Sequence, residues 1–183
     1  MLDDKYVALL RGINISGKNK VPMNDLKDSL IDLGYNNVLT YLNSGNVIFD
    51  SCIDDIDILT KEIRNMIKTK FNVDIPVYVN YFDDIKELLD NCPEWWGTDD
   101  KNIYDNIIFI IGPHNFEEVY SILGEENKNY EKIKNYKNFI FWSYDLKNYR
   151  KTNWWSKTIT TSISCNLTIR TGNTIRNLIK LGE

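Results

Sequence analysis

Residues 6–20 of the chain read YVALLRGINISGKNK, and this stretch guides the interpretation of all that follows. Its first five residues, Tyr6 to Leu10, are all apolar, which predicts a strand in the middle of a sheet. The next ten, Arg11 to Lys20, are mostly polar and contain two glycines, as expected of a loop. Pro22 then fits the first turn of a helix, where its missing N–H is not needed. The stretch therefore predicts a buried strand, a polar loop and a helix.

The residues that follow extend this start into a recognisable order of elements. Apolar residues at helical spacing predict a helix that ends at Gly34. Two short strands, 37–42 and 45–50, are joined at Asn43-Ser44-Gly45-Asn46, which is typical of a tight hairpin. An amphipathic helix over 54–71 and a strand over 75–79 complete the series. Strand, helix, strand, strand, helix, strand is the order of the split βαβ, or ferredoxin-like, motif.

The same order recurs after a connecting helix, 82–89, and an irregular stretch, 91–102. We expect strands over 103–111, 132–135, 139–142 and 167–170, with helices over 116–123, 154–163 and 174–181. The segment 154–163 stays open between helix and extended chain, because residues 158–164 are rich in β-branched side chains. The predicted fold class is α+β: two ferredoxin-like halves, residues 1–91 and 92–183, with antiparallel sheets and helices on one face. The halves either form two domains or pack as one compact unit.

Composition narrows the class of protein. The chain has 183 residues, 43% hydrophobic and 26% charged, as expected of a globular fold. Its net charge of -4 counts against a protein that binds nucleic acid mainly by neutralising phosphates. Three separated cysteines and one histidine form no metal-ligand spacing, so we expect neither a metal nor a cofactor. The sequence shows no signal peptide and no apolar run of the ~20 residues that span a membrane, so we expect a cytoplasmic protein.

The loop matches most of the P-loop pattern, since Gly12, Gly17 and Lys18 have the required spacing. The position that should supply a Mg²⁺-binding hydroxyl is Asn19, and Pro22 places the helix start several residues too late. A P-loop also requires parallel strands joined by crossovers, whereas the turn at Asn43 indicates a hairpin. We therefore interpret the loop as something other than a P-loop.

The ten residues of this loop include three cations, Arg11, Lys18 and Lys20, and also the polar residue Asn14. Two glycines allow the backbone to approach a ligand closely, and the cations can hold a phosphate or carboxylate by charge-assisted hydrogen bonds. The alternative is a solvated surface loop whose glycines only satisfy turn geometry. Ser44 and Asn46 add polar groups that can join this site, although a hairpin turn explains them equally well.

A second polar junction, residues 168–174, lies between the last strand and the last helix. Thr171 or Asn173 can cap that helix, and Arg170 lies close to its positive end. If this junction faces the first loop, Arg170 and Asn173 complete the anion site.

The chain has two pairs of adjacent tryptophans, Trp95-Trp96 and Trp154-Trp155. We expect one ring of each pair to be partly exposed, and that ring either covers the edge of the core or contacts a partner.

The motifs resemble those of a bacterial family, domain of unknown function 1697. The residues that carry the likeness are Tyr6 to Asn14, Gly17 to Met23, Ser44 to Phe49, and Thr168, Arg170, Asn173 and Thr174. The chain departs from the family pattern at Ser16, where glycine is usual, and at Thr171-Gly172, where asparagine and an aromatic residue are usual. The resemblance implies an α+β protein of two ferredoxin-like halves, and no particular activity.

Three functional hypotheses follow. The first is a protein that binds a small anion at the loop Arg11 to Lys20; whether it is an enzyme stays open. The second is a nucleic-acid-binding module, which requires exposed aromatic residues on the central strands, where the first half offers mainly Tyr6 and Phe49. The third is an interaction protein that uses its tryptophans to form an oligomer. The sequence favours the first.

Overall fold

The computed structural model describes residues 3–183, which form two compact units. The first unit extends to Glu87 and also includes Asn177–Glu183, whereas the second comprises Leu88–Arg176. Each contains one four-stranded antiparallel sheet with helices, so the predicted α+β, ferredoxin-like fold class is confirmed. The division into domains at residue 91 stays a prediction.

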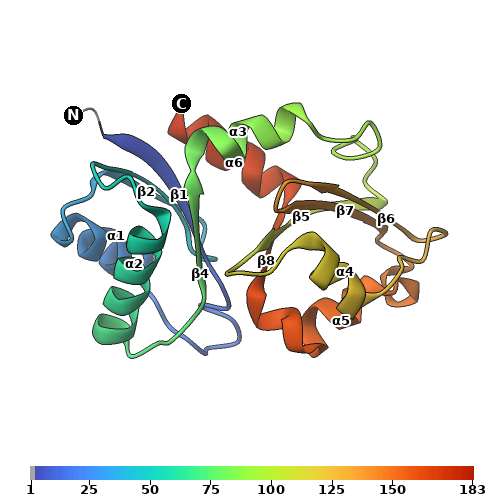
Figure 1. Ribbon diagram of the computed structural model, residues 1–183, viewed down its shortest axis with the longest axis horizontal. Coiled ribbons are helices and arrows are strands. Elements are labelled where there is room, and N and C mark those ends of the chain that lie inside the picture. The colour runs from blue at the N-terminus through green and yellow to red at the C-terminus, as the bar shows by residue number, and fades with distance from the viewer. Residues whose placement is uncertain (1–2) are drawn as a thin grey trace. The chain divides into compact units, whose positions relative to one another are not determined.

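The first unit is built on the sheet β2-β3-β1-β4 (Figure 1). Both neighbours of β1, namely β3 and β4, pair with it in antiparallel fashion, as the split βαβ order requires. The elements of this unit are β1 (Asp4–Leu10), α1 (Met23–Asp32), β2 (Asn36–Tyr41), β3 (Asn46–Ser51), α2 (Ile56–Phe71), β4 (Val77–Tyr81) and the first part of α3 (Phe82–Asp90).

One face of this sheet packs against α1 and α2. Alternate residues of β1, Tyr6, Ala8 and Leu10, form a buried cluster with apolar residues of the two helices, such as Leu30 and Ile63. The opposite face is also apolar, since Val7, Leu9 and Ile48 are at most 1% exposed. Burial of both faces explains why the sequence of β1 is apolar throughout, without the alternation of a strand that faces solvent.

The second unit repeats this plan with the sheet β6-β7-β5-β8. Its cluster on the helical face includes Ile108 and Ile110 of β5 with Trp154 of α5. The elements are β5 (Ile103–Ile110), α4 (Phe116–Leu123), β6 (Glu131–Tyr136), β7 (Phe139–Asp145), η1 (Tyr149–Lys151), α5 (Trp154–Thr160), η2 (Ser162–Asn166), β8 (Leu167–Thr171) and α6 (Gly172–Gly182), whose last residues belong to the first unit.

The ambiguous segment 154–163 is helical in its first part only. The α-helix α5 ends at Thr160, in the middle of the β-branched stretch 158–164, and Ser162–Asn166 then form the short 3-10 helix η2. The hydroxyl groups of Thr158, Thr160 and Thr161 donate to backbone carbonyls three or four residues earlier. Such bonds compete with the regular helical pattern and explain why the α-helix is short.

Candidate anion-binding loop

The tip of the loop after β1 is a tight two-residue turn. The N–H of Lys18 donates to the carbonyl of Ile15 at 2.9 Å, and Ser16 and Gly17 both have positive φ, 48° and 77°. Two successive residues with positive φ are the mark of a type I′ turn, the preferred connection of a narrow hairpin. Ser16 therefore adopts a left-handed conformation that L residues rarely take.

Asn14 closes the neck of the loop with its side chain. Its Oδ1 accepts from the N–H of Val21 at 2.9 Å, and its Nδ2 donates to the carbonyl oxygens of Val21 and Asn43, also at 2.9 Å. The backbone N–H of Asn14 donates to the carbonyl of Asn19, whose own amide donates to the carbonyl of Gly12. These bonds join the backbone of the loop to itself and to the β2–β3 turn.

The loop is packed against the β2–β3 turn. The N–H of Leu10 donates to the carbonyl of Gly45 at 2.8 Å. A Cβ at Gly45 would lie 2.6 Å from Cβ of Leu10 and 2.8 Å from Cδ1 of Ile13, so only glycine fits there. Asn46, which is fully buried, donates to the carbonyl of Tyr41 and to Oγ of Ser44. The structure therefore brings the predicted loop residues and the predicted turn residues together.

The surface of this sheet end carries cations and few acids. Arg11 is half-buried, and Lys18 and Lys20 are exposed. Residues 11–22, 38–49 and 75–80, which form this end, contain no Asp or Glu. Asp74, which directly precedes the third segment, accepts from Arg64 and Lys68 at 2.8 Å each, and these bonds, Lys68 first, lower its pKa. The three segments themselves therefore carry a positive charge, from Arg11, Lys18 and Lys20.

The opposite end of the same sheet is acidic. Asp4 begins β1 and lies opposite Ser51 at the end of β3, and Tyr6 lies opposite Tyr81 at the end of β4. Acidic residues cluster in sequence at these strand ends: Asp3, Asp4, Asp50, Asp54, Asp55, Asp83 and Asp84. The first unit thus has a strong separation of charge along its strands, which the overall net charge of -4 conceals.

The remaining predicted site residues, Arg170 and Asn173, belong to the second unit. Arg170 is only 8% exposed and donates to Oγ1 of Thr168 and the carbonyl of Ile169, both at 2.9 Å. Burial lowers its pKa to about 10, so the guanidinium stays protonated at neutral pH. Asn173 is exposed and accepts a long bond from Arg176.

Thr171 caps α6, as one of the two alternatives predicted, because its Oγ1 accepts from the N–H of Thr174 at 3.2 Å. The glycine at 172 has a packing reason. A Cβ there would lie 2.9 Å from the ring of Trp96, which donates through Nε1 to the carbonyl of Asn106. Glycine at 172 therefore leaves room for the ring of Trp96.

The aromatic residues serve mainly as packing. Tyr6 and Phe49 are fully buried on the helical face of the sheet, where their rings stack at 5.5 Å, so they present no surface to a nucleic-acid base. Trp96 and Trp154 are buried, while Trp95 and Trp155 are half-buried.

Within residues 3–183, no cluster of three or more His, Cys, Asp or Glu has the arrangement needed to hold a metal ion. No helix in the described range is long and apolar enough to cross a membrane.

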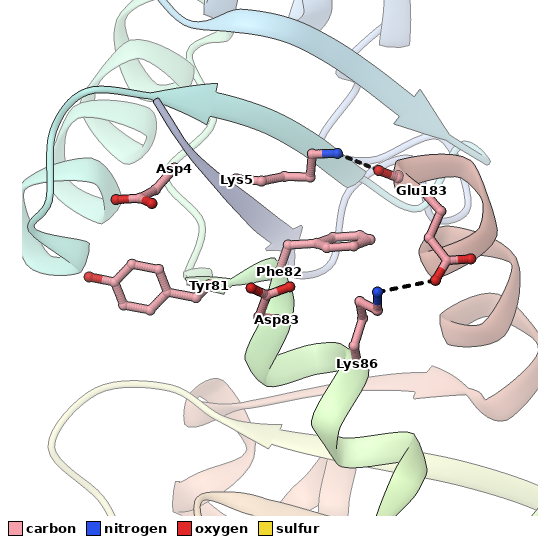
Figure 2. A pocket seen from close by; sticks show the side chains of 8 residues that line it. Asp4, Lys5, Tyr81, Phe82, Asp83, Lys86 and Glu183 are labelled. Carbon is pink, nitrogen blue, oxygen red and sulfur yellow. Dashed lines mark hydrogen bonds and ion pairs between the residues drawn. The ribbon is translucent and has the colours of Figure 1, made fainter. Parts of the chain in front are cut away.

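The structure also shows a cavity that sequence analysis missed, at the acidic end of the first unit (Figure 2). It has a volume of about 490 Å³ and is lined by Asp4, Lys5, Tyr81, Phe82, Asp83, Lys86, Gly182 and Glu183. These residues come from three distant parts of the sequence and match no local motif. The sequence feature that points toward this cavity is the acidic charge at the start of β1, Asp3 and Asp4, and after β4, Asp83 and Asp84.

The fold and the loop define an α+β protein of two ferredoxin-like sheets with a rigid, cation-bearing loop after the first strand. The chain belongs to the family described as Protein of unknown function (DUF1697), whose model matches residues 4–141. It is similar to the conserved bacterial protein SP0830 from Streptococcus pneumoniae, with 26% identity, a TM-score of 0.86 and full coverage of both chains. Among curated proteins, none matches the chain.

Proposed function

We propose that the loop Arg11 to Lys20 binds a small anion that carries a phosphate or carboxylate group. The observation that supports this most directly is a hydrogen-bonded loop with three cations, in segments 11–22, 38–49 and 75–80 that contain no Asp or Glu. A loop ordered before the ligand arrives loses little conformational entropy on binding. The positive end of the sheet also raises the local concentration of anions.

Different residues have different roles in this proposal. Lys18 and Lys20 are exposed and contact the anion directly, with Arg11 at the base of the loop. Among the described residues, the N–H groups of Ser16 and Gly17 donate to no protein acceptor, so they are available to an anion at the tip. The side chains of Asn14, Ser44 and Asn46 bond to the protein itself and act by positioning the loop.

Titration calorimetry with inorganic phosphate, pyrophosphate and citrate tests this proposal. The double variant Lys18→Ala/Lys20→Ala should weaken binding at least about tenfold, because each charge-assisted hydrogen bond contributes about 1.5–3 kcal/mol. Lys61→Ala is the matched control, since Lys61 is an exposed lysine of α2 in the same unit. Equal weakening in both variants would indicate a general charge effect and reject the loop as the site.

A short RNA in the same experiment separates the first hypothesis from the second. RNA that binds with unchanged affinity after Lys18→Ala/Lys20→Ala, while small anions do not bind at all, would favour a nucleic-acid-binding module. The buried rings of Tyr6 and Phe49 favour the opposite result, because base stacking requires an exposed aromatic face. Loss of all anion binding in the double variant supports the loop.

We also propose that the protein acts in the cytoplasm. Cys52, Cys92 and Cys165 are free thiols, and two of them are exposed, which suits a reducing compartment. Alkylation in intact cells followed by mass spectrometry should find all three cysteines alkylated, because free thiols react with the reagent and disulfides do not. A disulfide or a fully oxidised thiol in that experiment would contradict this location.

A further inference from the structure

The cavity at the acidic end of the first unit has the size of a site for a small molecule. Its volume, about 490 Å³, falls within the range of roughly 300–1,000 Å³ that is usual for ligand pockets. Its lining combines an apolar surface, from Phe82 and the ring of Tyr81, with charged groups of both signs. It lies at the end of β1 that is remote from the Arg11 to Lys20 loop, so it is a separate site.

The two cations of the lining have different partners. Lys86 Nζ lies 3.2 Å from Oε1 of Glu183, so its charge is compensated by a carboxylate. Lys5 donates to the backbone carbonyl of Gly182, and its Nζ lies 5.2 Å from the centre of the Phe82 ring. Both partners of Lys5 are neutral, so its positive charge is not balanced by an acid within salt-bridge distance among the described residues. Figure 2 shows these contacts of both lysines.

The two acids, Asp4 and Asp83, contribute the opposite charge. Both are exposed, and within residues 3–183 the side chain of neither forms a hydrogen bond or an ion pair. The hydroxyl of Tyr81 does not compensate them, because it donates to Asp54. In Figure 2, Asp4 lies on the side of the cavity away from Glu183. Once the pair Lys86–Glu183 is set aside, the lining retains two negative charges and one positive charge.

We propose that this cavity binds a small molecule of the amino-acid class, which carries both an ammonium and a carboxylate group. The ligand carboxylate accepts from Lys5 Nζ, the ammonium lies between the carboxylates of Asp4 and Asp83, and the apolar part lies against the partly exposed ring of Tyr81. The lining charge of -1, from Asp4, Asp83 and Lys5, is balanced by a ligand with one additional cation. A basic amino acid therefore fits better than a neutral one.

Titration calorimetry on the full chain with L-lysine, 1,5-diaminopentane and hexanoate tests this inference, because the second lacks the carboxylate and the third lacks both ammonium groups. L-lysine should bind at least about tenfold more tightly than either, since each missing group leaves a charged partner unsatisfied. Diaminopentane or hexanoate binding as tightly as L-lysine would overturn the proposal. So would the absence of L-lysine binding at millimolar concentration.

Variants then locate the site. Asp83→Asn and Lys5→Met should each weaken L-lysine binding at least about tenfold, whereas Asp28→Asn, an exposed acid of α1, should not change it. If Lys5→Met fails to fold, Asp83→Asn still decides, because Asp83 is an exposed residue in the first turn of α3. The loop variant Lys18→Ala/Lys20→Ala should leave L-lysine binding intact. Binding that survives Asp83→Asn, or that is lost with the loop lysines, would overturn the assignment.

Discussion

Asn14 pairs with Val21 as one peptide group pairs with another in a sheet: Nδ2 of Asn14 donates to the carbonyl of Val21, and Oδ1 accepts from its N–H, both at 2.9 Å. This reciprocal pair joins the two ends of the loop. It also fixes the backbone directly before Pro22, which is why α1 begins only at Met23. The loop is therefore part of the folded scaffold, and its exposed lysines, Lys18 and Lys20, are the groups to which we assign the proposed anion contacts.

The first prediction concerns this pair. Asn14→Ala removes three hydrogen bonds, each with a net value of about 1 kcal/mol, and places alanine at a φ of 55°, which costs about 1 kcal/mol more. We expect a loss of about 2–4 kcal/mol in the free energy of unfolding, measured in urea. Asn65→Ala, on the exposed face of α2, should change it by less than about 0.5 kcal/mol. Equal stability of the two variants would show that the loop neck does not contribute.

The second prediction compares two glycines with nearly equal φ. Gly45 (74°) has no room for a Cβ, whereas Gly17 (77°) has no heavy atom within 4 Å of the position that a Cβ would take. Gly17→Ala should cost only the backbone strain, about 1 kcal/mol, while Gly45→Ala adds a steric overlap of about 1–3 kcal/mol. Thermal unfolding of both variants checks the difference. A melting temperature that is no lower for Gly45→Ala than for Gly17→Ala would contradict the close packing of turn and loop.

Local patterns in the sequence predicted most of the fold. The apolar run of β1, the helical spacing after Pro22 and the turn at Asn43-Ser44 correspond to observed elements, because each is set by interactions over a few residues. The segment 154–163 could not be assigned, because its threonine side chains compete for the backbone carbonyls of the helix. That competition depends on rotamers, which composition alone does not reveal.

The sequence predicted the residues of the loop but not their separate roles. Lys18 and Arg11 are cations in any structure, so their chemistry could be inferred directly. That the amide of Asn14 would donate to the carbonyl of Asn43 depends on the approach of the β2–β3 turn, a contact between residues 29 positions apart. Asn46 instead bonds within its own turn, to Tyr41 and Ser44. The cavity lined by Lys5 and Glu183 joins residues near both ends of the chain, and no local motif could indicate it.

The third prediction concerns a buried carboxylate in the second unit. Glu131 is 2% exposed, and its oxygens accept from Nε1 of Trp142 at 3.0 Å and from the backbone N–H groups of Asn127, Asn153 and Trp154. Glu131→Gln keeps the shape but turns one oxygen into an NH₂ group that faces donors. We expect a loss of about 2–3 kcal/mol in the free energy of unfolding, because buried N–H groups lose their acceptor.

Glu117→Gln provides the control for this variant, since Glu117 is an exposed acid in the first turn of α4. Its effect should be below about 0.5 kcal/mol. The fluorescence of the tryptophans offers a second measurement, because Nε1 of Trp142 and the backbone N–H of Trp154 both donate to Glu131. A Glu131→Gln variant with unchanged stability would mean that the four donors find other acceptors.

The fourth prediction concerns pH and Asp74, the acid directly before the segment 75–80. Hydrogen bonds from Lys68 and Arg64 hold the pKa of Asp74 below its usual value of 3.8. A carboxyl group whose pKa is lowered by folding stabilises the native state above its unfolded pKa. This contribution disappears as the pH falls through the lowered value. Asp74→Asn should therefore reduce the urea midpoint at pH 7 and pH 5 by equal amounts, and by less at pH 3.

Salt provides the control for this last prediction, because Asp74 and both its partners are exposed. Raising the ionic strength to about 1 M shortens the screening length to about 3 Å, so the difference between the wild type and Asp74→Asn should also shrink at pH 7. Asp28→Asn, which removes an exposed acid without a salt bridge in the described part of the chain, should show neither dependence. If Asp74→Asn lowers the urea midpoint equally at pH 3 and pH 7, the charge of Asp74 is not the cause. The loss of stability would then come from changed packing or hydrogen bonding at this position.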